Sequence, residues 1–437
     1  MKSFTVRPSW ARAGPNTKPN RPSHHANDQG TAFRNPWPSA DAPTWAELLD
    51  GKFPLGWYDN LAKNHPGTRD VKVVTPDWGA SNLKEQGLAR RNCIIGTTLG
   101  HAGTIAEIPL EGTEGKDGEK KSLWVLVDPI FSLRAGPTQY MGPQRMKPPP
   151  CQVSDLPGCD VVMISHNHYD HLDLVTIQAV VKKFPKARYF VPLGNKGWIS
   201  SLGVSGDKIF ELDWWQNREY SVQDLGHTTA PNGSEDTMIR FTCVPAQHNS
   251  GRGALDQGTT LWCGWVIEQL LVSKDEADTS KLRRKGAIYH AGDTGYRRTA
   301  KSSAVCPVFK EIGLRFGGFD LAFIPIWRGG TLGFISNFGL RLSHNDIPSA
   351  LHTAPIDAID IHNDVFSKNT LAVHFGTFVG SENESLEAIM EFQEGRENRG
   401  VLPLDGQANN ERGRAGIVDI GGSFAVEISV QDIVGKS

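Results

Sequence analysis

Three histidines and an aspartate fall within six positions of the chain, directly after a short apolar run at residues 161–164. The four residues are His166, His168, Asp170 and His171. Histidine makes up only 14 of the 437 residues, so this spacing would arise by chance in about one such chain in a thousand. Imidazole and carboxylate together suit zinc or another borderline divalent metal. Because the run predicts a buried strand, His166 and His168 can face one ion, while Asp170 and His171 can reach a second.

Further ligand candidates follow other apolar runs, and they are needed because four side chains cannot complete two metal sites. Each of the three lies just beyond a run of Val, Ile, Leu or Phe: His248, Asp293 and His374. Strands that deliver side chains into one cleft produce this pattern of polar residues after apolar runs. The sequence therefore predicts a single site built from several strand ends.

The composition is that of a soluble or peripherally bound intracellular protein. Hydrophobic residues make up 38% and charged residues 22% of the chain, whose length fits one to three domains at about 150 residues each. The formal net charge is −2, so no global attraction toward nucleic acid is expected. No apolar run of about 18 residues, the length that spans a bilayer, is present. The six cysteines form no Cys-x-x-Cys pair, and we expect reduced thiols.

Composition also divides the chain into three regions. Residues 1–32 are predicted to be a tail, because the start of the chain is basic, lacks acidic residues and cannot bury a core. Disorder is one interpretation of this tail, and an Arg-rich organelle-targeting segment, mitochondrial targeting included, is the rival. Residues 33–71 are expected to form an aromatic- and proline-rich arm, and residues 72–437 the catalytic domain.

The long third region alternates short Val-, Ile-, Leu- and Phe-rich runs with helical patterns, which predicts an α/β fold with buried strands. Helices are expected at 172–183, where apolar residues recur at helical spacing, and at 347–354. No internal repeat is present, so the strands are expected to form one compact unit. The expected strands are 92–95, 124–127, 161–164, 187–191, 239–245, 260–267, 287–289, 321–324 and 370–373.

With these ligand candidates the chain resembles the metallo-β-lactamase superfamily, whose fold is an αβ/βα sandwich of two mixed β-sheets flanked by helices. More narrowly, several stretches in order resemble the N-acylphosphatidylethanolamine-hydrolysing phospholipases D, roughly from Phe33 to Phe378. The stretches are Asp128-Pro-Ile-Phe-Ser-Leu-Arg134, Gln139-Tyr-Met-Gly-Pro143, Ser165-His-Asn-His-Tyr-Asp-His-Leu-Asp173, Val191-Pro-Leu-Gly194, Glu211-Leu-Asp-Trp-Trp215, Ala291-Gly-Asp-Thr-Gly-Tyr296 and His374-Phe-Gly-Thr-Phe378.

The resemblance implies two zinc ions per protomer. Carried over by position, the ligands are His166, His168 and His248 for one zinc, Asp170, His171 and His374 for the other, and Asp293 bridging both. Asp170 and Asp293 are expected to be the catalytic carboxylates. A shared carboxylate offsets the repulsion between two cations about 3.5–4 Å apart. A water activated by both ions would attack the phosphorus of a phosphodiester in line, and the implied products are phosphatidic acid and an N-acylethanolamine.

Two further positions match substrate contacts of the family, Tyr169 and His344. A Tyr hydroxyl and a His nitrogen beside two metals can hydrogen-bond an amide or a phosphate. The alternatives are that Tyr169 packs and that His344 precedes the helix expected at 347–354. His101 is expected to support the ligands rather than to bind metal, and His290 to pack in the core. No role is predicted for the other histidines: His24, His25, His65, His227, His352 and His362.

The predicted partner is a membrane phospholipid, reached by peripheral association with an organelle membrane or from the cytoplasm, and a homodimer is left open. Two apolar clusters are candidates for bilayer contact, and the alternative is that both pack within the protein or in a subunit interface. The clusters are Trp37, Trp45, Phe53, Trp57 and Tyr58 in the arm, and Leu332, Phe334, Ile335, Phe338 and Leu340 before His344.

Two other functions stay open from the sequence. Another hydrolase of the same fold, such as a lactonase, thioesterase or nuclease, would use the same ligands. A nuclease would also need a basic stripe near the site, and only scattered Arg and Lys occur around Tyr169 and His344. A non-catalytic metal- or lipid-binding protein would not require Asp293 and His374 together.

Overall fold

The computed structural model describes residues 22–42, 56–57, 68–111, 113, 121–226, 235–273, 282–328, 340–341, 349–407 and 411–432. The predicted substrate contact His344 lies outside the described residues, as do most of the predicted tail and arm. The side chains of the apolar cluster predicted at 332–340 also lie outside them.

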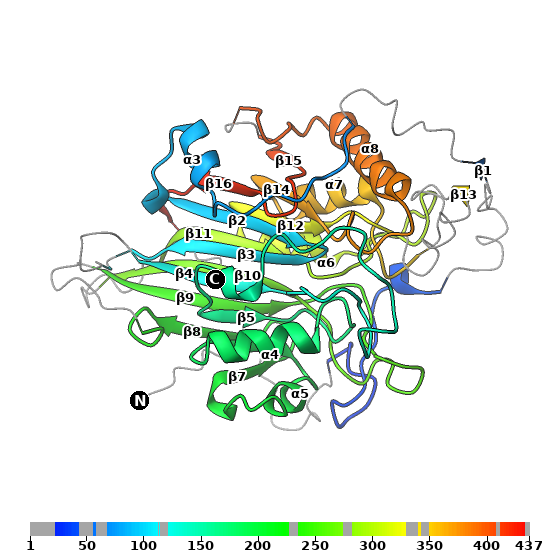
Figure 1. Ribbon diagram of the computed structural model, residues 1–437, viewed down its shortest axis with the longest axis horizontal. Helices are drawn as coiled ribbons and strands as arrows, with labels where there is room; N and C mark the ends of the chain where they lie inside the picture. Colours follow the sequence, from blue (N-terminus) through cyan, green and yellow to red (C-terminus); the bar gives the residue numbers. More distant parts are fainter. Residues whose placement is uncertain are drawn as a thin grey trace, which may run out of the picture.

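Two mixed β-sheets form the centre of the molecule (Figure 1). The first sheet has seven strands in the spatial order β16 (Ser423–Glu427), β2 (Cys93–Gly100), β3 (Gly103–Pro109), β4 (Ser122–Val127), β5 (Val161–Met163), β6 (Arg188–Pro192) and β7 (Ile209–Leu212). The second runs β15 (Arg414–Gly416), β14 (Asn369–Val373), β12 (Leu321–Pro325), β11 (Arg283–His290), β10 (Gly264–Ser273), β9 (Glu235–Val244) and β8 (Asn217–Ser221), with β17 (Gln431–Asp432) paired to β11. A separate pair joins β1 (Gly56–Trp57) to β13 (Leu340–Arg341).

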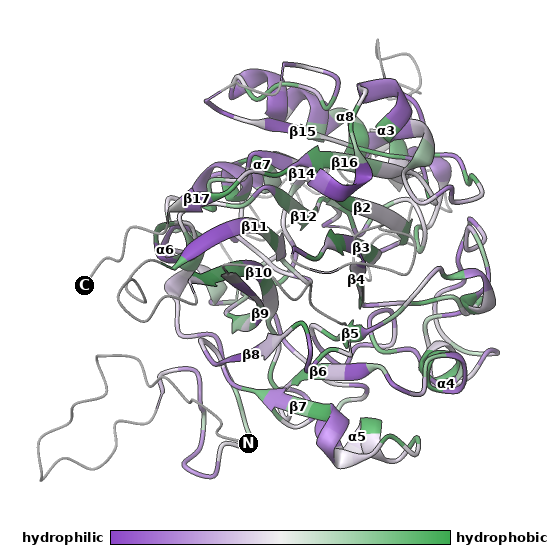
Figure 2. Cartoon of the chain, turned by 90° about the vertical axis from the view of Figure 1, so that its left-hand side faces the viewer, coloured by the Kyte–Doolittle hydropathy of each residue, from purple (hydrophilic) through white to green (hydrophobic). Residues whose placement is uncertain are grey.

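Helices cover the outer faces of both sheets, with α4 and α5 on one side and α7 and α8 on the other (Figure 1). Between the sheets, the rings of Phe190 and Phe241 lie 4.6 Å apart. Figure 2 shows hydrophobic colour on β10 and hydrophilic colour on part of the neighbouring β11. This is the αβ/βα sandwich that the resemblance implies. The helices are α3 (Ala80–Gln86), α4 (Leu174–Lys183), α5 (Lys196–Ser200), α6 (Val308–Phe316), α7 (Pro355–Asp364) and α8 (Glu382–Asn398), and the 3-10 turns are Pro38–Ala40, Arg90–Asn92, Val153–Asp155 and Gly206–Lys208.

All nine predicted strands are present, although their bounds differ. The strand expected at 260–267 begins only at Gly264, because the preceding backbone pairs elsewhere: the Leu261 N–H donates to the Leu193 carbonyl and the Cys263 N–H to the Ser165 carbonyl. Pairing with β9 then continues as far as Ser273. The elements not predicted are the strands β1, β3, β7, β8, β13, β15, β16 and β17 and the helices α3, α5, α6 and α8.

The helix predicted at 347–354 is wrong for the part that the structure describes. Residues 349–354 are not helical, and α7 begins at Pro355. The proline ring disfavours helical backbone at the preceding residue. Ala354 is accordingly extended, with φ −71° and ψ 153°, and Pro355 takes the first helical position, where its missing N–H costs no bond.

The region expected to be a tail is in part ordered. Residues 22–42, which we call the strap, lie on the domain, and His24 is only 6% exposed. Trp37 from the predicted arm stacks on Trp214, with ring centroids 5.5 Å apart and an interplanar angle of 13°. This contact favours internal packing over bilayer contact for Trp37. Within the described residues, no helix is both long and apolar enough to cross a membrane.

Candidate metal centre

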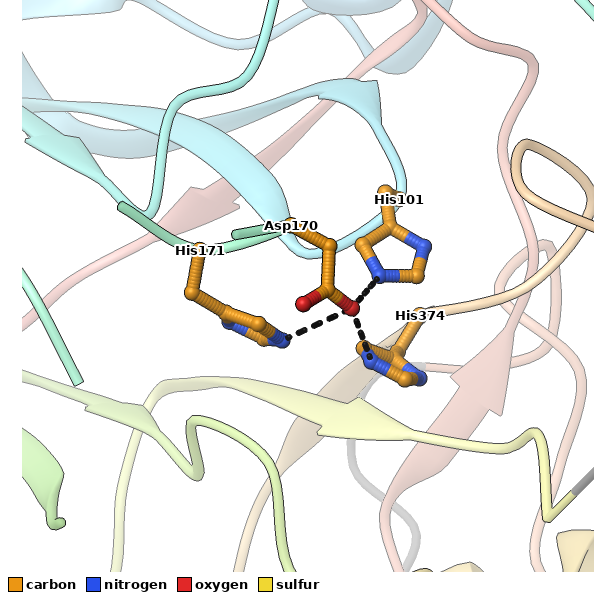
Figure 3. A group of neighbouring side chains, drawn as sticks. All are labelled: His101, Asp170, His171 and His374. Carbon is orange, nitrogen blue, oxygen red and sulfur yellow. Dashed lines mark hydrogen bonds and ion pairs between the residues drawn. The ribbon is translucent and has the colours of Figure 1, made fainter. Parts of the chain in front are cut away.

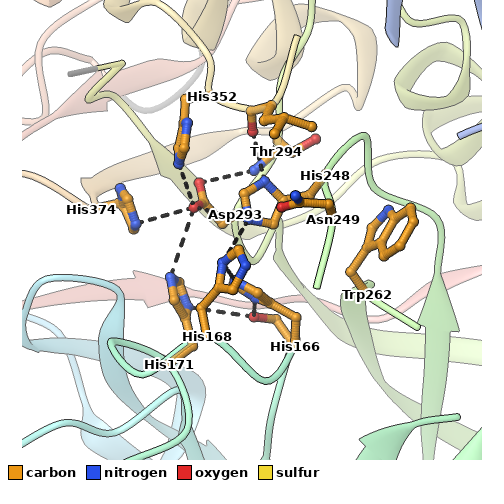
Figure 4. A network of polar contacts seen from close by, with 12 residues as sticks. His166, His168, His171, His248, Asn249, Trp262, Asp293, Thr294, His352 and His374 are labelled. Carbon is orange, nitrogen blue, oxygen red and sulfur yellow. Dashed lines mark hydrogen bonds and ion pairs between the residues drawn. The ribbon is translucent and has the colours of Figure 1, made fainter. Parts of the chain in front are cut away.

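Loops from both sheets bring their polar side chains together at one place (Figure 4). The loop after β5 carries His166 and His168, and the loop after β9 carries His248. His166 Nε2 lies 2.8 Å from His168 Nδ1, and His248 Nε2 lies 3.3 Å from the same atom. These three imidazoles form the first group of metal-ligand candidates, as the sequence predicted.

A second group surrounds the carboxylate of Asp170 (Figure 3). His374, which follows β14, places Nε2 at 3.6 Å from Asp170 Oδ2, and His171 places Nε2 at 3.7 Å. His101, in the turn between β2 and β3, donates through Nε2 to the same oxygen at 2.8 Å. Two parallel strand runs, β4 to β7 and β11 to β15, end at this edge, which explains why distant segments meet here.

Asp293 lies between the two groups (Figure 4). Its Oδ2 is 3.4 Å from His248 Nε2 on the side of the first group. On the side of the second group, the same oxygen is 3.3 Å from His374 Nε2 and 3.9 Å from His171 Nε2. Asp293 therefore lies within 4 Å of histidines from both groups.

The donor set fits a pair of divalent transition-metal ions. His171 Nε2 and both ring nitrogens of His374 are buried and have no hydrogen-bond partner among the described residues. Buried polar atoms normally have a partner, and imidazole nitrogens that face carboxylates are the usual partners of zinc-like ions. The seven residues predicted from the sequence are thus together in space, and they form candidate metal-binding groups.

Burial keeps the first group in the form that binds metal. It lowers the pKa of His166 well below the ordinary value, lowers that of His168, and lowers that of His248 to about 3. Neutral imidazole is the metal-binding form, so no proton has to leave these rings near neutral pH.

The carboxylates of the centre are held ionised. Burial opposes the charged form of Asp293, but the neighbouring histidines, His374 first, hold its pKa well below the ordinary value. Asp170 behaves in the same way, with His171 as the strongest stabilising neighbour. Burial by itself would lower the pKa of His171, but Asp170 and then Asp128 outweigh it and raise that pKa to about 9.

Residues behind the ligands fix their orientation. Asp128 accepts hydrogen bonds from the Ser165 N–H at 2.7 Å and from His171 Nδ1 at 2.9 Å. His248 Nδ1 lies 2.8 Å from the Leu351 carbonyl oxygen. A hydrogen bond at Nδ1 leaves Nε2 with its lone pair toward the centre, which is how ligand histidines are usually supported.

Backbone strain is concentrated here as well. His101, Asp128 and His374 have φ values of 53°, 44° and 59°, in the left-handed region that costs an L-residue about 1–2 kcal/mol. The His374 N–H donates to the His101 carbonyl at 2.8 Å, and the His101 N–H donates to Thr377 Oγ1 at 2.8 Å. These bonds hold two strained residues in place, a pattern common at functional sites.

One histidine of the site was not predicted. His352 Nε2 is 3.1 Å from Asp293 Oδ2, and the side chain is 22% exposed, so it borders the centre and the solvent. It follows no apolar run, and no spacing rule connects it to the other ligands. Tyr169 is half-buried and packs against the cluster of Ile130, Ala135 and Phe378, with the Arg252 guanidinium 4.5 Å from its ring centroid. His101 contacts Asp170, in keeping with the supporting role expected for it.

His290, at the end of β11, packs in the core as predicted. Because it is buried, it should make the stability of the protein depend on pH in the acid range. Burial lowers the pKa of His290 to about 4, whereas the unfolded chain binds a proton near pH 6.5. Native stability contributed by this residue is therefore lost as the pH falls from about 6.5 through 4. We expect His290→Gln to reduce the stability difference between pH 7 and pH 4 by about 3 kcal/mol. Urea titrations at both pH values, with chelator present throughout, measure it, and an unchanged difference would contradict this origin.

The chain is similar in sequence to known proteins. A family model described as a beta-lactamase superfamily domain matches residues 123–375. N-acyl-phosphatidylethanolamine-hydrolyzing phospholipase D 1 of Caenorhabditis elegans is 30% identical over 337 residues, which cover 75% of this chain and 78% of the nematode protein. The mitochondrial N-acyl-phosphatidylethanolamine-hydrolyzing phospholipase D of Saccharomyces cerevisiae is 29% identical over 266 residues, covering 61% of this chain and 46% of the yeast protein. A solved metallo hydrolase from Ignicoccus hospitalis has a TM-score of 0.41 at 15% identity, covering 77% of this chain and 99% of that one.

Proposed function

Because the chain belongs to the beta-lactamase superfamily, within the family of N-acylphosphatidylethanolamine-hydrolysing phospholipases D, we propose that it is a dinuclear-zinc phosphodiesterase of that type. It would hydrolyse N-acylphosphatidylethanolamine to an N-acylethanolamine and phosphatidic acid. The observation that carries the proposal is the position of Asp293 between a three-histidine group and a group around Asp170. Two ions held in this way suit a phosphodiester, whose transition state spreads charge over several oxygens.

The protein's own residues supply charge and positioning. When bound, two zinc ions would supply positive charge at the phosphorus and a nucleophilic water near neutral pH. Asp170 and Asp293 place negative charge on both sides of the centre and hold it together. His352 donates toward Asp293 and faces the exposed side, where it can meet a substrate oxygen. Tyr169 is the predicted hydrogen-bond donor, and His344 stays a predicted substrate contact.

Protein nucleophiles near the ligands are poorly placed for covalent catalysis. Ser165 is buried, and its hydroxyl donates to Asp128 Oδ2 at 2.6 Å. The buried Cys263 thiol lies against the Ser165 carbonyl, and burial raises its pKa well above the ordinary value. A protonated, enclosed thiol and an engaged hydroxyl favour direct attack by water over an enzyme-bound ester.

An exposed apolar loop supports peripheral contact with a phospholipid surface. Within residues 133–146, Tyr140 is 92% and Met141 61% exposed, and Leu133 and Met146 are about half exposed. The loop is tied to the centre, because the Met146 N–H donates to the carbonyl of Thr377, three residues after His374. Large apolar side chains in this place can enter the headgroup region beside the site. We propose that the chain's substrate lies in a membrane. The yeast relative's name describes that protein as mitochondrial, and mitochondrial targeting of this chain stays a prediction.

Labelling with oxygen-18 water shows which bond is cleaved during hydrolysis. Hydrolysis of N-acylphosphatidylethanolamine in oxygen-18 water is expected to place the label on the phosphate of phosphatidic acid, because water attacks phosphorus. Mass spectrometry of both products measures it. Label on the ethanolamine hydroxyl would mean carbon–oxygen cleavage and would contradict the mechanism.

The substrate class is tested separately with a panel of phosphatidylethanolamine, N-acylphosphatidylethanolamine, lactone, thioester and nucleic-acid substrates. Preferred turnover of the N-acylated phospholipid supports the proposal. Turnover of a lactone, thioester or nucleic acid alone would assign the chain to another hydrolase of this fold. Metal-replete protein without activity on the whole panel would favour a binding role.

A further inference from the structure

Two adjacent histidines of the strap hold one carboxylate of the domain. His24 Nε2 lies 2.7 Å from Asp213 Oδ1, and His25 Nε2 lies 2.8 Å from Asp213 Oδ2. The Trp214 N–H also donates to Asp213 Oδ1 at 2.8 Å. All three side chains are at most 13% exposed. We call His24, His25 and Asp213 the clasp, because it joins residues about 190 positions apart to each other.

Packing and backbone bonds make the strap a defined structure around the clasp. The His24 ring stacks on Trp214 at 4.1 Å. The Arg34 N–H donates to the His24 carbonyl at 2.9 Å, which closes residues 24–34 into a hairpin. Phe33 then donates its N–H to the Gly258 carbonyl at 2.8 Å. The clasp thus fixes where the following residues of the strap must lie.

Those following residues contact the loop that carries His248. The Asn35 side-chain amide donates to the His248 carbonyl at 2.7 Å. Ser39 Oγ donates to Gln247 Oε1 at 2.5 Å, and Gln247 Nε2 returns a bond to the Ser39 carbonyl at 3.3 Å. The strap therefore holds the backbone of a ligand candidate and the side chain of the residue before it.

Gln247 also forms hydrogen bonds with other segments near the centre. It is fully buried, and its Nε2 also donates to the Ala350 carbonyl at 2.7 Å, two residues before His352. Its backbone N–H donates to Thr294 Oγ1 at 2.9 Å, directly after Asp293. Gln247 is thereby bonded to three segments that reach the site in addition to its own.

We propose that the strap is a positioning element for the metal ligand His248, with Asn35 as the residue that orients the ligand and the clasp as its anchor. The inference rests on the proposed metal centre but not on any particular substrate. His248 is held at its ring by the Leu351 carbonyl and at its own carbonyl by Asn35. Loss of such an outer contact typically weakens metal affinity about 10–100-fold.

The clasp itself is assigned as a hydrogen-bonded anchor. Each histidine meets a different oxygen of Asp213 at hydrogen-bond distance, and none of the three residues has a buried polar atom without a partner. His171 and His374 in the centre do have such atoms. The side chains of the clasp satisfy one another, whereas the centre contains buried ring nitrogens that have no partner among the described residues.

The test compares Asn35→Ala and the isosteric Asn35→Asp with Asn27→Ala. Asn27 is a matched control, because it is an asparagine of the strap whose side chain, among the described residues, bonds only Thr31. Full-length, zinc-loaded proteins are titrated with a competing chelator, and the metal retained is measured by mass spectrometry. We expect both Asn35 variants to release one of two equivalents at about 10–100-fold lower chelator activity, and Asn27→Ala to match the parent. If Asn35→Ala fails to fold, Asn35→Asp gives the same comparison.

Two readouts separate positioning from general stability and from the choice of substrate. Cobalt-substituted Asn35→Asp should show an altered visible spectrum, which loosening elsewhere would leave unchanged. The double variant His24→Asn, His25→Asn should shift the chelator curve in the same direction.

Chelator curves and spectra of the Asn35 variants that coincide with those of Asn27→Ala would overturn the proposal. Three equivalents in the parent and two in the double variant would make the clasp an ion site and overturn its assignment. Two retained equivalents without phospholipid turnover would defeat only the proposed activity.

Discussion

Replacing Asp293 with asparagine is expected to lower turnover about a thousandfold and to reduce the bound metal below two equivalents. The carboxylate faces His248 on one side and His374 on the other, so both ions would lose a negative charge at once. Electrostatic stabilisation by such ions is worth several kcal/mol, and about 4 kcal/mol corresponds to three powers of ten at 1.4 kcal/mol each. Metal analysis and steady-state kinetics on the same preparation measure the two effects.

The control for this variant is Asp320→Asn. Asp320 is also a buried carboxylate, but it precedes β12 at the other end of the sheet and accepts bonds from the Ala287 N–H and Lys368. Its loss should lower stability while the folded protein keeps both ions and its turnover number. Full activity and two equivalents of metal in Asp293→Asn would show that this carboxylate is not shared by the ions.

Removing the metal is expected to lower the free energy of unfolding by about 5 kcal/mol. Each of two sites filled at about a hundred times its dissociation constant adds about 2.7 kcal/mol, because the unfolded chain does not preserve the arrangement of ligands. Stripped protein also keeps Asp170 and Asp293 ionised and buried histidine nitrogens unpaired. Urea unfolding of zinc-loaded and stripped protein at pH 7 measures the difference.

Zinc added back to the stripped protein should restore the original urea midpoint. Removing the metal should lower the free energy of unfolding less in Asp293→Asn than in the wild type, because the variant binds metal more weakly to begin with. Identical midpoints for loaded and stripped wild-type protein would mean that the described side chains do not hold ions tightly, and both the centre and the strap's role would have to be abandoned.

The positions of the ligand candidates were predictable because each candidate follows an apolar run that forms a strand. β5, β9, β11 and β14 are recognisable from their Val, Ile, Leu and Phe content, and the polar residues beyond them are conspicuous. Local pattern and tertiary position agree at these places, so reading the ends of strands was enough to assemble seven side chains.

Elements whose formation depends on distant partners were missed. β8 has largely exposed residues and owes its strand form to pairing with β9, while β16 pairs with β2 from the far end of the chain. His352 sits beside Asp293 only because the segment before α7 turns there, not because of any repeat. The clasp could not be predicted for the same reason, because the bond from His24 to Asp213 spans 189 residues and no local sequence pattern indicates it.

The placement of the centre at the seam between two sheets sets an order of events during biosynthesis. Its side chains begin with His101 and end with His374, so nearly the whole chain must leave the ribosome before both groups exist. A chain released before β14 would carry the three-histidine group without the second one. Under the proposed dinuclear centre, metal loading would follow the folding of β14, and two bound ions would distinguish a molecule that has both groups from a shorter chain.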